Sequence, residues 1–368
     1  MNQKSDKTVS AKPLFQTAAL CLFALAAAFC FRSALYLPAL FLVMAGGGIL
    51  AVIFFSCPRV FAALEAAVLV AILFVASGME PAALLFGGAA LLASITVFIC
   101  IRKRMEKGTV TLAVTGVLLV ISLIAFAALY FAEGGELSLS AMQSMIDDIF
   151  EEIYETLTAA VRAGYAALPA DTVAAYESRG VTLADLVSAA QESLRETVAL
   201  VKMILPGILL FALQTLAYVA VTSFQTTAKL SYGEKLIPAS QFVIYPTKVT
   251  CVIYMLTASL YAICAIFVSS TSLFMVMVLN MLLAVMPAMI ACGFSCLRMR
   301  MLHPFTKTRT TVITILVVLG CLFLPSYVIP VAVLLLGFVG AQDVFMLRAL
   351  REQKERIERG EDDEDFMD

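Results

Sequence analysis

The sequence predicts an all-α membrane protein: a polytopic transmembrane helical bundle of about ten spans, with an amphipathic helical hairpin outside the bilayer. Of the 368 residues, 62% are hydrophobic and only 14% are charged, and the mean hydropathy is +0.97. A soluble domain is about 45–50% apolar and about 25% charged. This excess of apolar residues excludes a soluble enzyme, a disordered chain and a disulfide-rich secreted domain.

Apolar segments of spanning length recur along the whole chain. A transmembrane helix needs about 20 apolar residues. Residues 311–345 are too long for one helix, and Pro325 and Pro330 around Ser326-Tyr327 predict a tight turn that divides them in two. The expected spans are 14–31, 34–56, 60–78, 82–101, 109–132, 203–224, 249–269, 272–297, 310–324 and 328–347.

Basic residues predict the orientation of these spans, because cytoplasmic loops collect Lys and Arg. With the N-terminus inside, 20 of the 25 basic residues lie on the cytoplasmic side. We therefore expect a protein of the cytoplasmic membrane, with a cytoplasmic N-terminus at 1–13 and a charged cytoplasmic tail at 348–368. Five spans in 14–132 and five in 203–347 form the two membrane parts. A cleaved signal peptide ending near Ala26-Ala27-Ala28 is the alternative for the first span, and retention is favoured.

The segment 133–202 differs in character, since it holds twelve acidic residues and lies outside in this topology. Ser140-Ala-Met-Gln143 fits a helix-start capping box, and Asp185 is placed to complete a cap at Thr182. One apolar stripe is formed by Met142, Ile146, Ile149, Ile153, Leu157 and Val161, and a second by Leu183, Leu186, Val187, Leu194 and Val198. Pro169 and Gly180 bracket the join. The hairpin is a lid or partner platform, or else it packs its apolar faces together or on the bundle and leaves an acidic exterior in water.

Three polar residues at membrane depth are the candidate substrate-binding residues: Glu65, Gln214 and Asn280. Buried ionisable groups in a membrane are costly, so Glu65 could bind a cation or relay a proton, or else reach the interface as a snorkelling or protonated carboxyl. Gln214 and Asn280 could bind substrate or simply join helices by hydrogen bonds.

Small residues and one proline suggest where helices pack closely or bend. Gly46-Gly-Gly48 and Gly87-Gly88 permit close helix approach. Pro287 should kink its span, and broken helices line many transporter sites. Bending for packing alone is an equal alternative.

Several function classes have no support in the sequence. The formal net charge of −2 gives no basic field for nucleic acid. The nine cysteines form no C-x-x-C pair and His303 stands alone, so we expect no metal site and no cofactor. No Walker-type loop or catalytic set is present, so we expect no enzyme, and active transport would need a separate energising partner or an ion gradient.

The second half of the chain resembles the bacterial YybS-like family of integral membrane proteins, also called DUF2232. The resemblance is carried by Leu205-Pro206-Gly-Ile-Leu-Leu-Phe-Ala-Leu-Gln214, Phe242-Val-Ile-Tyr245-Pro246, Asn280 and Gly340-Ala-Gln-Asp343-Val-Phe-Met-Leu-Arg348. Met286-Pro-Ala-Met-Ile290 departs from the glutamine–glycine pair frequent in the family. The family has no assigned biochemistry, and its general look is similar to the substrate-capture subunits of energy-coupling-factor transporters.

Two functions follow as hypotheses. The first is a substrate-binding or transport component with a pocket between helices, lined by Glu65, Gln214 and Asn280. The second is a non-transporting scaffold that organises envelope proteins through the external hairpin or the cytoplasmic tail. In both cases the lipid bilayer is the surrounding solvent.

Overall fold

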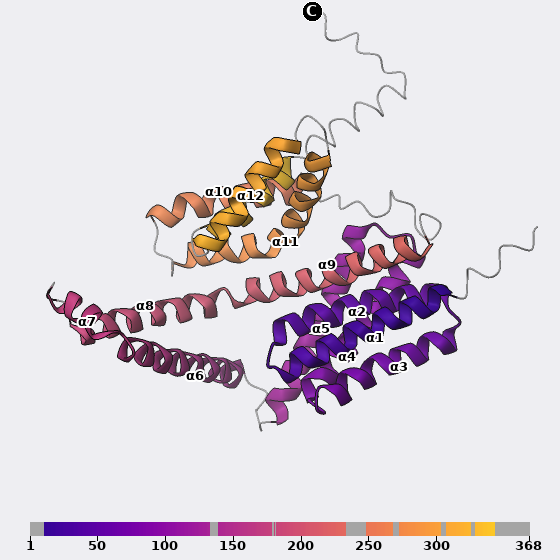
Figure 1. The fold of residues 1–368 in the computed structure, drawn as a ribbon, viewed down its shortest axis with the longest axis horizontal. Coiled ribbons are helices and arrows are strands. Elements are labelled where there is room, and N and C mark those ends of the chain that lie inside the picture. The colour runs from indigo at the N-terminus through magenta and orange to yellow at the C-terminus, as the bar shows by residue number, and fades with distance from the viewer. Residues whose placement is uncertain are drawn as a thin grey trace, which may run out of the picture. The chain divides into compact units, whose positions relative to one another are not determined.

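The computed structural model describes residues 11–132, 139–178, 180, 182–232, 248–267, 272–302, 307–324 and 328–342, and their regular structure is helical throughout (Figure 1). The predicted turn at 325–327, the resembling segments at 242–246 and 343–348, most of the N-terminal segment 1–13 and the tail at 348–368 lie outside the described residues. Clustering of the chain gives two compact units. Unit 1 is Met1–Leu123, Leu210–Ala258 and Ala284–Asp368, and unit 2 is Ile124–Leu209 and Ser259–Leu283.

The first five predicted spans are helices joined by short connections. They are α1 (Ala11–Arg32), α2 (Tyr36–Ser56), α3 (Arg59–Ala76), α4 (Pro81–Arg102) and α5 (Lys107–Ala132). Left-handed backbone at Ala34, at Gly78 and Met79, and at Arg104 reverses the chain between them.

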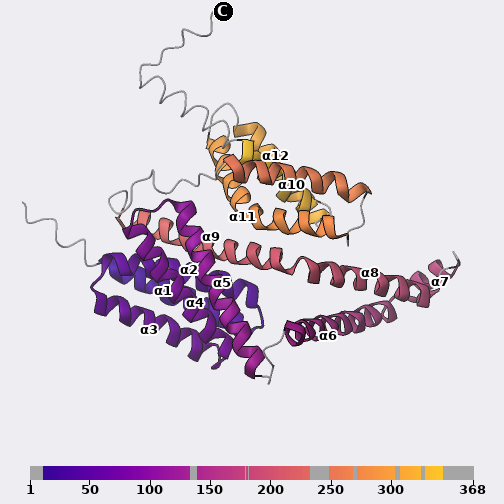
Figure 2. The ribbon, with the colours of Figure 1, turned by 180° about the vertical axis from the view of Figure 1, so that it is seen from behind.

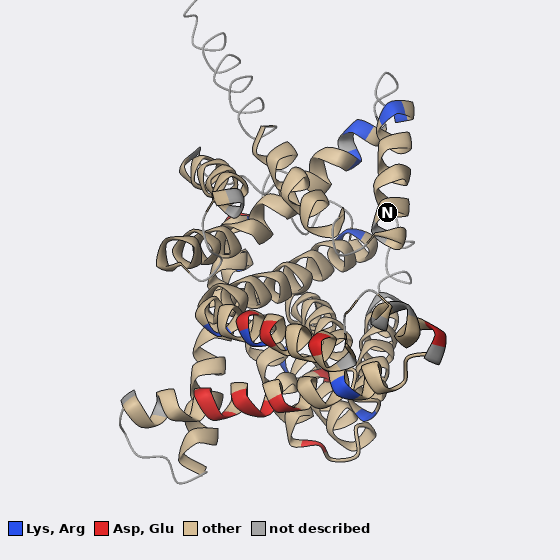
Figure 3. Ribbon diagram, turned by 90° about the vertical axis from the view of Figure 1, so that its left-hand side faces the viewer, with Lys and Arg blue, Asp and Glu red and all other residues tan. Residues whose placement is uncertain are grey.

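The described residues of the last five predicted spans also form helices: α9 (Leu205–Tyr232), α10 (Lys248–Phe267), α11 (Leu273–Leu302), α12 (Lys307–Phe323) and a final helix, Val328–Gln342. Seven helices, α1 to α5, α9 and α11, are long and apolar enough to cross a bilayer, so the chain is a multi-pass membrane protein. Their ribbons run for long stretches without a charged residue (Figure 3). The apolar side chains of α12 are exposed almost all round, which suits a surface in contact with lipid.

The core of unit 1 is built on α2, whose three consecutive glycines lie against four other helices, α1, α3, α4 and α9. A methyl group at Gly46 would lie 3.7 Å from Leu20 and Leu69 side-chain atoms, and one at Gly47 would lie 3.0 Å from the Ala90 carbonyl oxygen. At Gly48 it would overlap the backbone of α9, where the Phe224 amide nitrogen would be only 2.7 Å away. Successive residues on a helix point about 100° apart, so three consecutive glycines allow close approach of neighbouring helices on several sides of α2.

Two side-chain hydrogen bonds hold α9 in this position. Ser223 donates to the Ala45 carbonyl oxygen of α2 at 2.7 Å. Lys107, at the start of α5, is only 7% exposed and donates to Gln225 Oε1 at 2.9 Å. The first bond joins α9 to α2, and the second joins α9 to α5. Each bond adds a specific contact to the apolar packing.

A second close approach in unit 1 joins α11 to the final helix. A methyl group at Gly340 would lie 2.6 Å from the Gly293 amide nitrogen, and one at Gly293 would overlap the Leu336 carbonyl. Tyr254 of α10 donates to the Leu334 carbonyl oxygen at 2.9 Å and packs edge-on against Phe338. The absence of a side chain at Gly293 and at Gly340 is what permits this close approach.

Unit 2 contains the acidic hairpin, in which α6 (Leu139–Ala166) and α8 (Leu183–Met203) pack against each other. The short helix α7 (Ala170–Glu177) connects them at one end, as Figure 2 shows. The two long helices are antiparallel: Lys202 forms an ion pair with Asp147 near one end. At the other end the Arg162 guanidinium lies 3.0 Å from Gln191, with the amide oxygen turned toward it.

The helix starts are predicted partly correctly. The capping box at Thr182 is confirmed: the Thr182 hydroxyl accepts from the Asp185 amide, and the Asp185 carboxylate accepts from the Thr182 backbone and hydroxyl. These bonds lower the pKa of Asp185, so the cap is retained as the pH falls until that carboxylate is protonated. The capping box predicted at Ser140 is wrong, because α6 begins one residue earlier, at Leu139, and Ser140 lies within its first turn.

The predicted apolar stripe of α6 is only partly covered. Ile149, Ile153 and Leu157 each remain 42% exposed. Phe150 and Tyr154, on the adjacent side of the helix, are half-buried. The expectation that the hairpin packs its two apolar faces together therefore holds only in part.

We predict that Gly48→Ala lowers the melting temperature of the detergent-purified protein by several degrees, because overpacking against a backbone costs about 1–3 kcal/mol or more. Gly88→Ala is the matched control, since no atom lies within 4 Å of its added methyl group. The control should melt at or slightly above the wild-type temperature. Equal melting of the two variants would contradict the close approach of α2 and α9.

Candidate functional site

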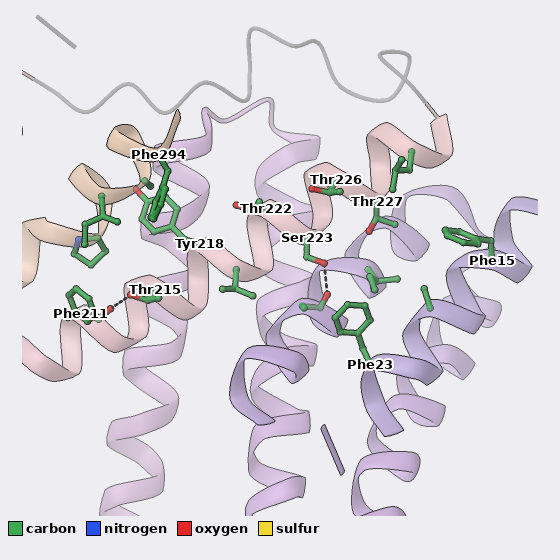
Figure 4. A pocket seen from close by; sticks show the side chains of 18 residues that line it. Phe15, Phe23, Phe211, Thr215, Tyr218, Thr222, Ser223, Thr226, Thr227 and Phe294 are labelled. Atoms are coloured by element: carbon green, nitrogen blue, oxygen red, sulfur yellow. Dashed lines mark hydrogen bonds between the residues drawn. The ribbon is translucent and has the colours of Figure 1, made fainter. Parts of the chain in front are cut away.

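A cleft of about 670 Å³ opens in unit 1 between α1, α2, α9 and the second half of α11. Its volume lies within the range of small-molecule sites. Figure 4 shows α9 running along it, with Phe294 of α11 toward one end and Phe15 and Phe23 of α1 toward the other. The walls are almost wholly apolar, and aromatic rings line both ends.

The polar groups of the cleft are hydroxyls carried by one helix. Thr215, Tyr218, Thr222 and Thr226 all line the cleft from α9, at spacings of three, four and four residues that keep them on one face. The Thr215 hydroxyl donates to the Phe211 carbonyl oxygen of its own helix at 2.7 Å. A row of hydroxyls on an apolar wall can orient a ligand by hydrogen bonds without carrying charge.

Four hydroxyls that line the cleft are available to a ligand. Within the described part of the chain, Tyr218, Thr222, Thr226 and Thr227 make no side-chain hydrogen bond, and Thr222 and Thr226 are exposed. Ser223 is different, because its hydroxyl is used to hold α2. These hydroxyls lie along the middle and the C-terminal half of α9, whereas the Thr215 hydroxyl, next to Phe211 and Pro287 in the lining, is bonded to its own helix. The free hydroxyls of the cleft therefore lie away from the Phe211 and Pro287 end.

The wall on the α11 side is shaped by Pro287. A proline inside a helix cannot donate to the carbonyl four residues before it, so this part of the backbone is under-bonded. Gln214 of α9 donates to the next carbonyl, that of Ala284, at 2.8 Å. The predicted membrane-depth amide is thus used to bond α11 backbone close to its proline.

Asn280 also bonds helix backbone, in unit 2. Its Oδ1 accepts from the Gly207 amide at 2.8 Å, in the first turn of α9, where the backbone N–H groups have no partner within the helix. Its Nδ2 donates to the Val276 carbonyl at 3.0 Å and to that of Met203, the last residue of α8, at 3.2 Å. One amide therefore serves the end of one helix and the start of the next.

Glu65 lies elsewhere in unit 1, between α1 and α3. It is 4% exposed, and its Oε1 accepts from the Thr17 hydroxyl at 2.8 Å. The three residues predicted to share a pocket are therefore not brought together: none of them lines the cleft, and Asn280 belongs to a different unit from the other two. Gln214 and Asn280 occupy positions that fit the alternative interpretation, hydrogen bonding between helices.

The cleft-lining hydroxyls were not singled out from the sequence, although a signal for them exists. Threonine or tyrosine recurs at 215, 218, 222 and 226 within a span that is otherwise mostly apolar. That spacing predicts one polar face, but it does not say whether the face meets a neighbouring helix or a cavity.

The residues that line the cleft supply surfaces for binding. Among the described residues no group of three or more His, Cys, Asp or Glu side chains could hold a metal ion. Neither a carboxylate nor a basic group lines the cleft. What the site offers is apolar surface, aromatic rings and hydroxyl hydrogen bonds.

Comparison with known proteins identifies no relative of this chain. No family model, no characterised protein and no solved structure matches the chain. The YybS-like resemblance and its implications therefore stay predictions.

We predict that Asn280→Ala destabilises the junction between α8 and α9. Leaving the Gly207 amide and the Met203 carbonyl without their partner should cost about 1–3 kcal/mol for each group that stays buried. Thermal melting in detergent, together with limited proteolysis near residue 204, measures this effect. Met281→Ala, at an adjacent and half-exposed position, is the control, and an Asn280→Ala variant as stable as this control would contradict the assigned role.

Proposed function

We propose that this protein is a membrane-embedded binding component for a small amphiphile, which it holds in the cleft between α1, α2, α9 and α11. The observation that carries the proposal is the composition of the cleft: apolar and aromatic walls, with hydroxyls along α9 from Tyr218 to Thr227 that make no hydrogen bond to a described residue. A ligand that fits has a hydrogen-bonding head near Thr222 and Thr226 and an apolar tail along Phe211 and Pro287.

The dimensions of the cleft support a lipid-like ligand. Its lining residues on α9 extend from Phe211 to Leu230, which at 1.5 Å per residue is about 29 Å of helix. This length is close to the hydrocarbon thickness of a bilayer. Leu230 is 74% exposed and Phe294 is 59% exposed, so the rim of the cleft is itself apolar and suits access from lipid.

The membrane topology is part of the proposal. We infer ten spans, with both termini in the cytoplasm and residues 133–202 outside the cytoplasmic membrane, on the strength of the Lys and Arg distribution. α10, α12 and Val328–Gln342 occupy the three additional spans, although they are shorter or less apolar than the other seven. Movement of the amphiphile would need an energising partner or an ion gradient, as in the transporters that the YybS-like proteins resemble.

We predict that the protein, extracted with its surrounding lipid in polymer nanodiscs, carries an amphiphile enriched over the bulk membrane, as measured by lipid mass spectrometry. Ala19→Phe fills the cleft and should reduce that enrichment severalfold. Ala18→Phe places the same ring on the same helix at an exposed position that does not line the cleft, so it should retain the ligand. A wild-type lipid profile identical to bulk membrane would contradict the proposal.

The scaffold function is kept as a second candidate, because one observation favours it. Ile149, Ile153 and Leu157 form an exposed apolar strip on α6. Asp148 and Glu152 are exposed on the border of that strip, with no ion pair to any described residue. An apolar strip beside unpaired acidic groups suits a basic amphipathic partner better than an anionic lipid surface.

A photo-reactive residue at position 153 tests this candidate. If the strip is an interface, it should crosslink reproducibly to one envelope protein, whereas the same residue at 151, on the opposite side of α6, should not. Crosslinks to lipid alone, or equal yields from both positions, would contradict a scaffold role for the hairpin.

A further inference from the structure

Glu65 is the one acidic residue within the seven long apolar helices that the structure describes. It lies in the second turn of α3 and is almost completely buried. One carboxylate oxygen accepts from the Thr17 hydroxyl, and the other, Oε2, is buried without a hydrogen-bond partner. A hydroxyl donor for one oxygen is a small compensation for a carboxylate removed from water.

The side chains around Glu65 are polar as well. Gln16, next to Thr17 on α1, is fully buried, and its Nε2 has no hydrogen-bond partner. Ser56, at the end of α2, lies 3.5 Å from Gln16 Oε1 but 2.8 Å from the Val52 carbonyl oxygen. A hydroxyl has one hydrogen, and the shorter contact takes it. The Gln16 amide is thus held only weakly and is able to turn either its oxygen or its nitrogen toward a ligand.

Nothing among the described residues supplies the positive charge that a buried carboxylate requires. No Lys, Arg or His nitrogen of that part of the chain forms an ion pair with Glu65, and Arg59, at the start of the same helix, is exposed. The titratable neighbours are thiols: Cys21 of α1, close enough to interact electrostatically with Glu65, and Cys57, beside Ser56. A water molecule would offer hydrogen bonds but no charge.

We propose that Glu65, Thr17, Gln16 and Ser56 form a binding site for a small monovalent cation, either a proton or Na⁺. A proton on Oε2 neutralises the carboxyl and turns it into a donor. A Na⁺ ion takes oxygen ligands from the Glu65 carboxylate and from the Gln16 amide once its oxygen faces the ion. Both give the carboxylate the positive charge that its surroundings lack.

The site shares α1 with the cleft. Gln16 and Thr17 belong to the cation site, whereas Phe15, Ala19 and Phe23 line the cleft. A cation that ties α1 to α3 is therefore placed to affect the cleft wall, which would give the binding component a link to an ion gradient. The cation site itself does not depend on the proposed amphiphile.

Labelling with dicyclohexylcarbodiimide in native membranes tests the proposal, because this apolar reagent couples to carboxyl groups that are protonated in apolar surroundings. The stable N-acylurea adduct would be located by peptide mass spectrometry. We expect Glu65 to be labelled in the wild type and in the control Glu80→Gln, whose altered side chain lies in an exposed loop, and no label at this position in Glu65→Gln. Labelling that falls severalfold when Na⁺ replaces choline at fixed pH identifies Na⁺, and labelling indifferent to Na⁺ identifies the proton.

A second measurement tests the site independently, because the reagent could fail to reach a buried carboxyl group. The melting temperature of the purified wild type should rise with Na⁺ or fall as the pH is raised, and Glu65→Gln, which needs no cation, should fold and show neither dependence. An unlabelled Glu65 together with wild-type melting that responds neither to Na⁺ nor to pH would overturn the cation site. That result would leave the amphiphile cleft untouched, because the cleft is tested by its own ligand and its own variants.

Discussion

The contact between the α2 and α9 backbones at Gly48 is the constraint on which unit 1 depends. In a bilayer, lipid tails satisfy apolar side chains as well as other helices do, so close backbone approach and hydrogen bonds must supply the specificity of packing. Gly48 permits that approach, and Ser223 reinforces it by donating to Ala45. Ser223 also lines the cleft, beside Thr222 and Thr226 of the same helix. The packing contact and the candidate binding surface therefore adjoin one another on α9.

Polar side chains at membrane depth divide into two groups by what they bond. Asn280 and Gln214 hydrogen-bond to the backbone of another helix, Asn280 at the junction of α8 and α9 and Gln214 at Ala284, close to Pro287. Glu65 and Gln16 do not hydrogen-bond to the backbone of another helix, and each keeps a buried polar atom without a partner. A membrane interior penalises that arrangement strongly. The first group is explained by architecture alone, whereas the second is explained by a ligand, which is why we place the cation site there.

Much of the fold follows from the sequence, because apolar run length and turn residues are local properties. Each of the ten expected spans contains a helix in its described residues, seven of these helices are long and apolar enough to cross a bilayer, and the cap at Thr182 and Asp185 forms as its spacing predicts. The site was harder to predict. Glu65, Gln214 and Asn280 are conspicuous as polar residues in apolar runs, but which neighbour each one meets depends on helix packing. The same limit applies to α6, where a regular apolar stripe does not reveal that α8 leaves Ile149, Ile153 and Leu157 exposed.

The most direct test of this account is an electron cryo-microscopy structure of the protein in lipid nanodiscs. The account predicts α2 and α9 in backbone contact at Gly48, and an elongated density in the cleft that runs from the hydroxyls of Thr222 and Thr226 toward Pro287. A map in which α9 is separated from α2, or in which the chain's own side chains fill the space between α1, α9 and α11, would contradict it.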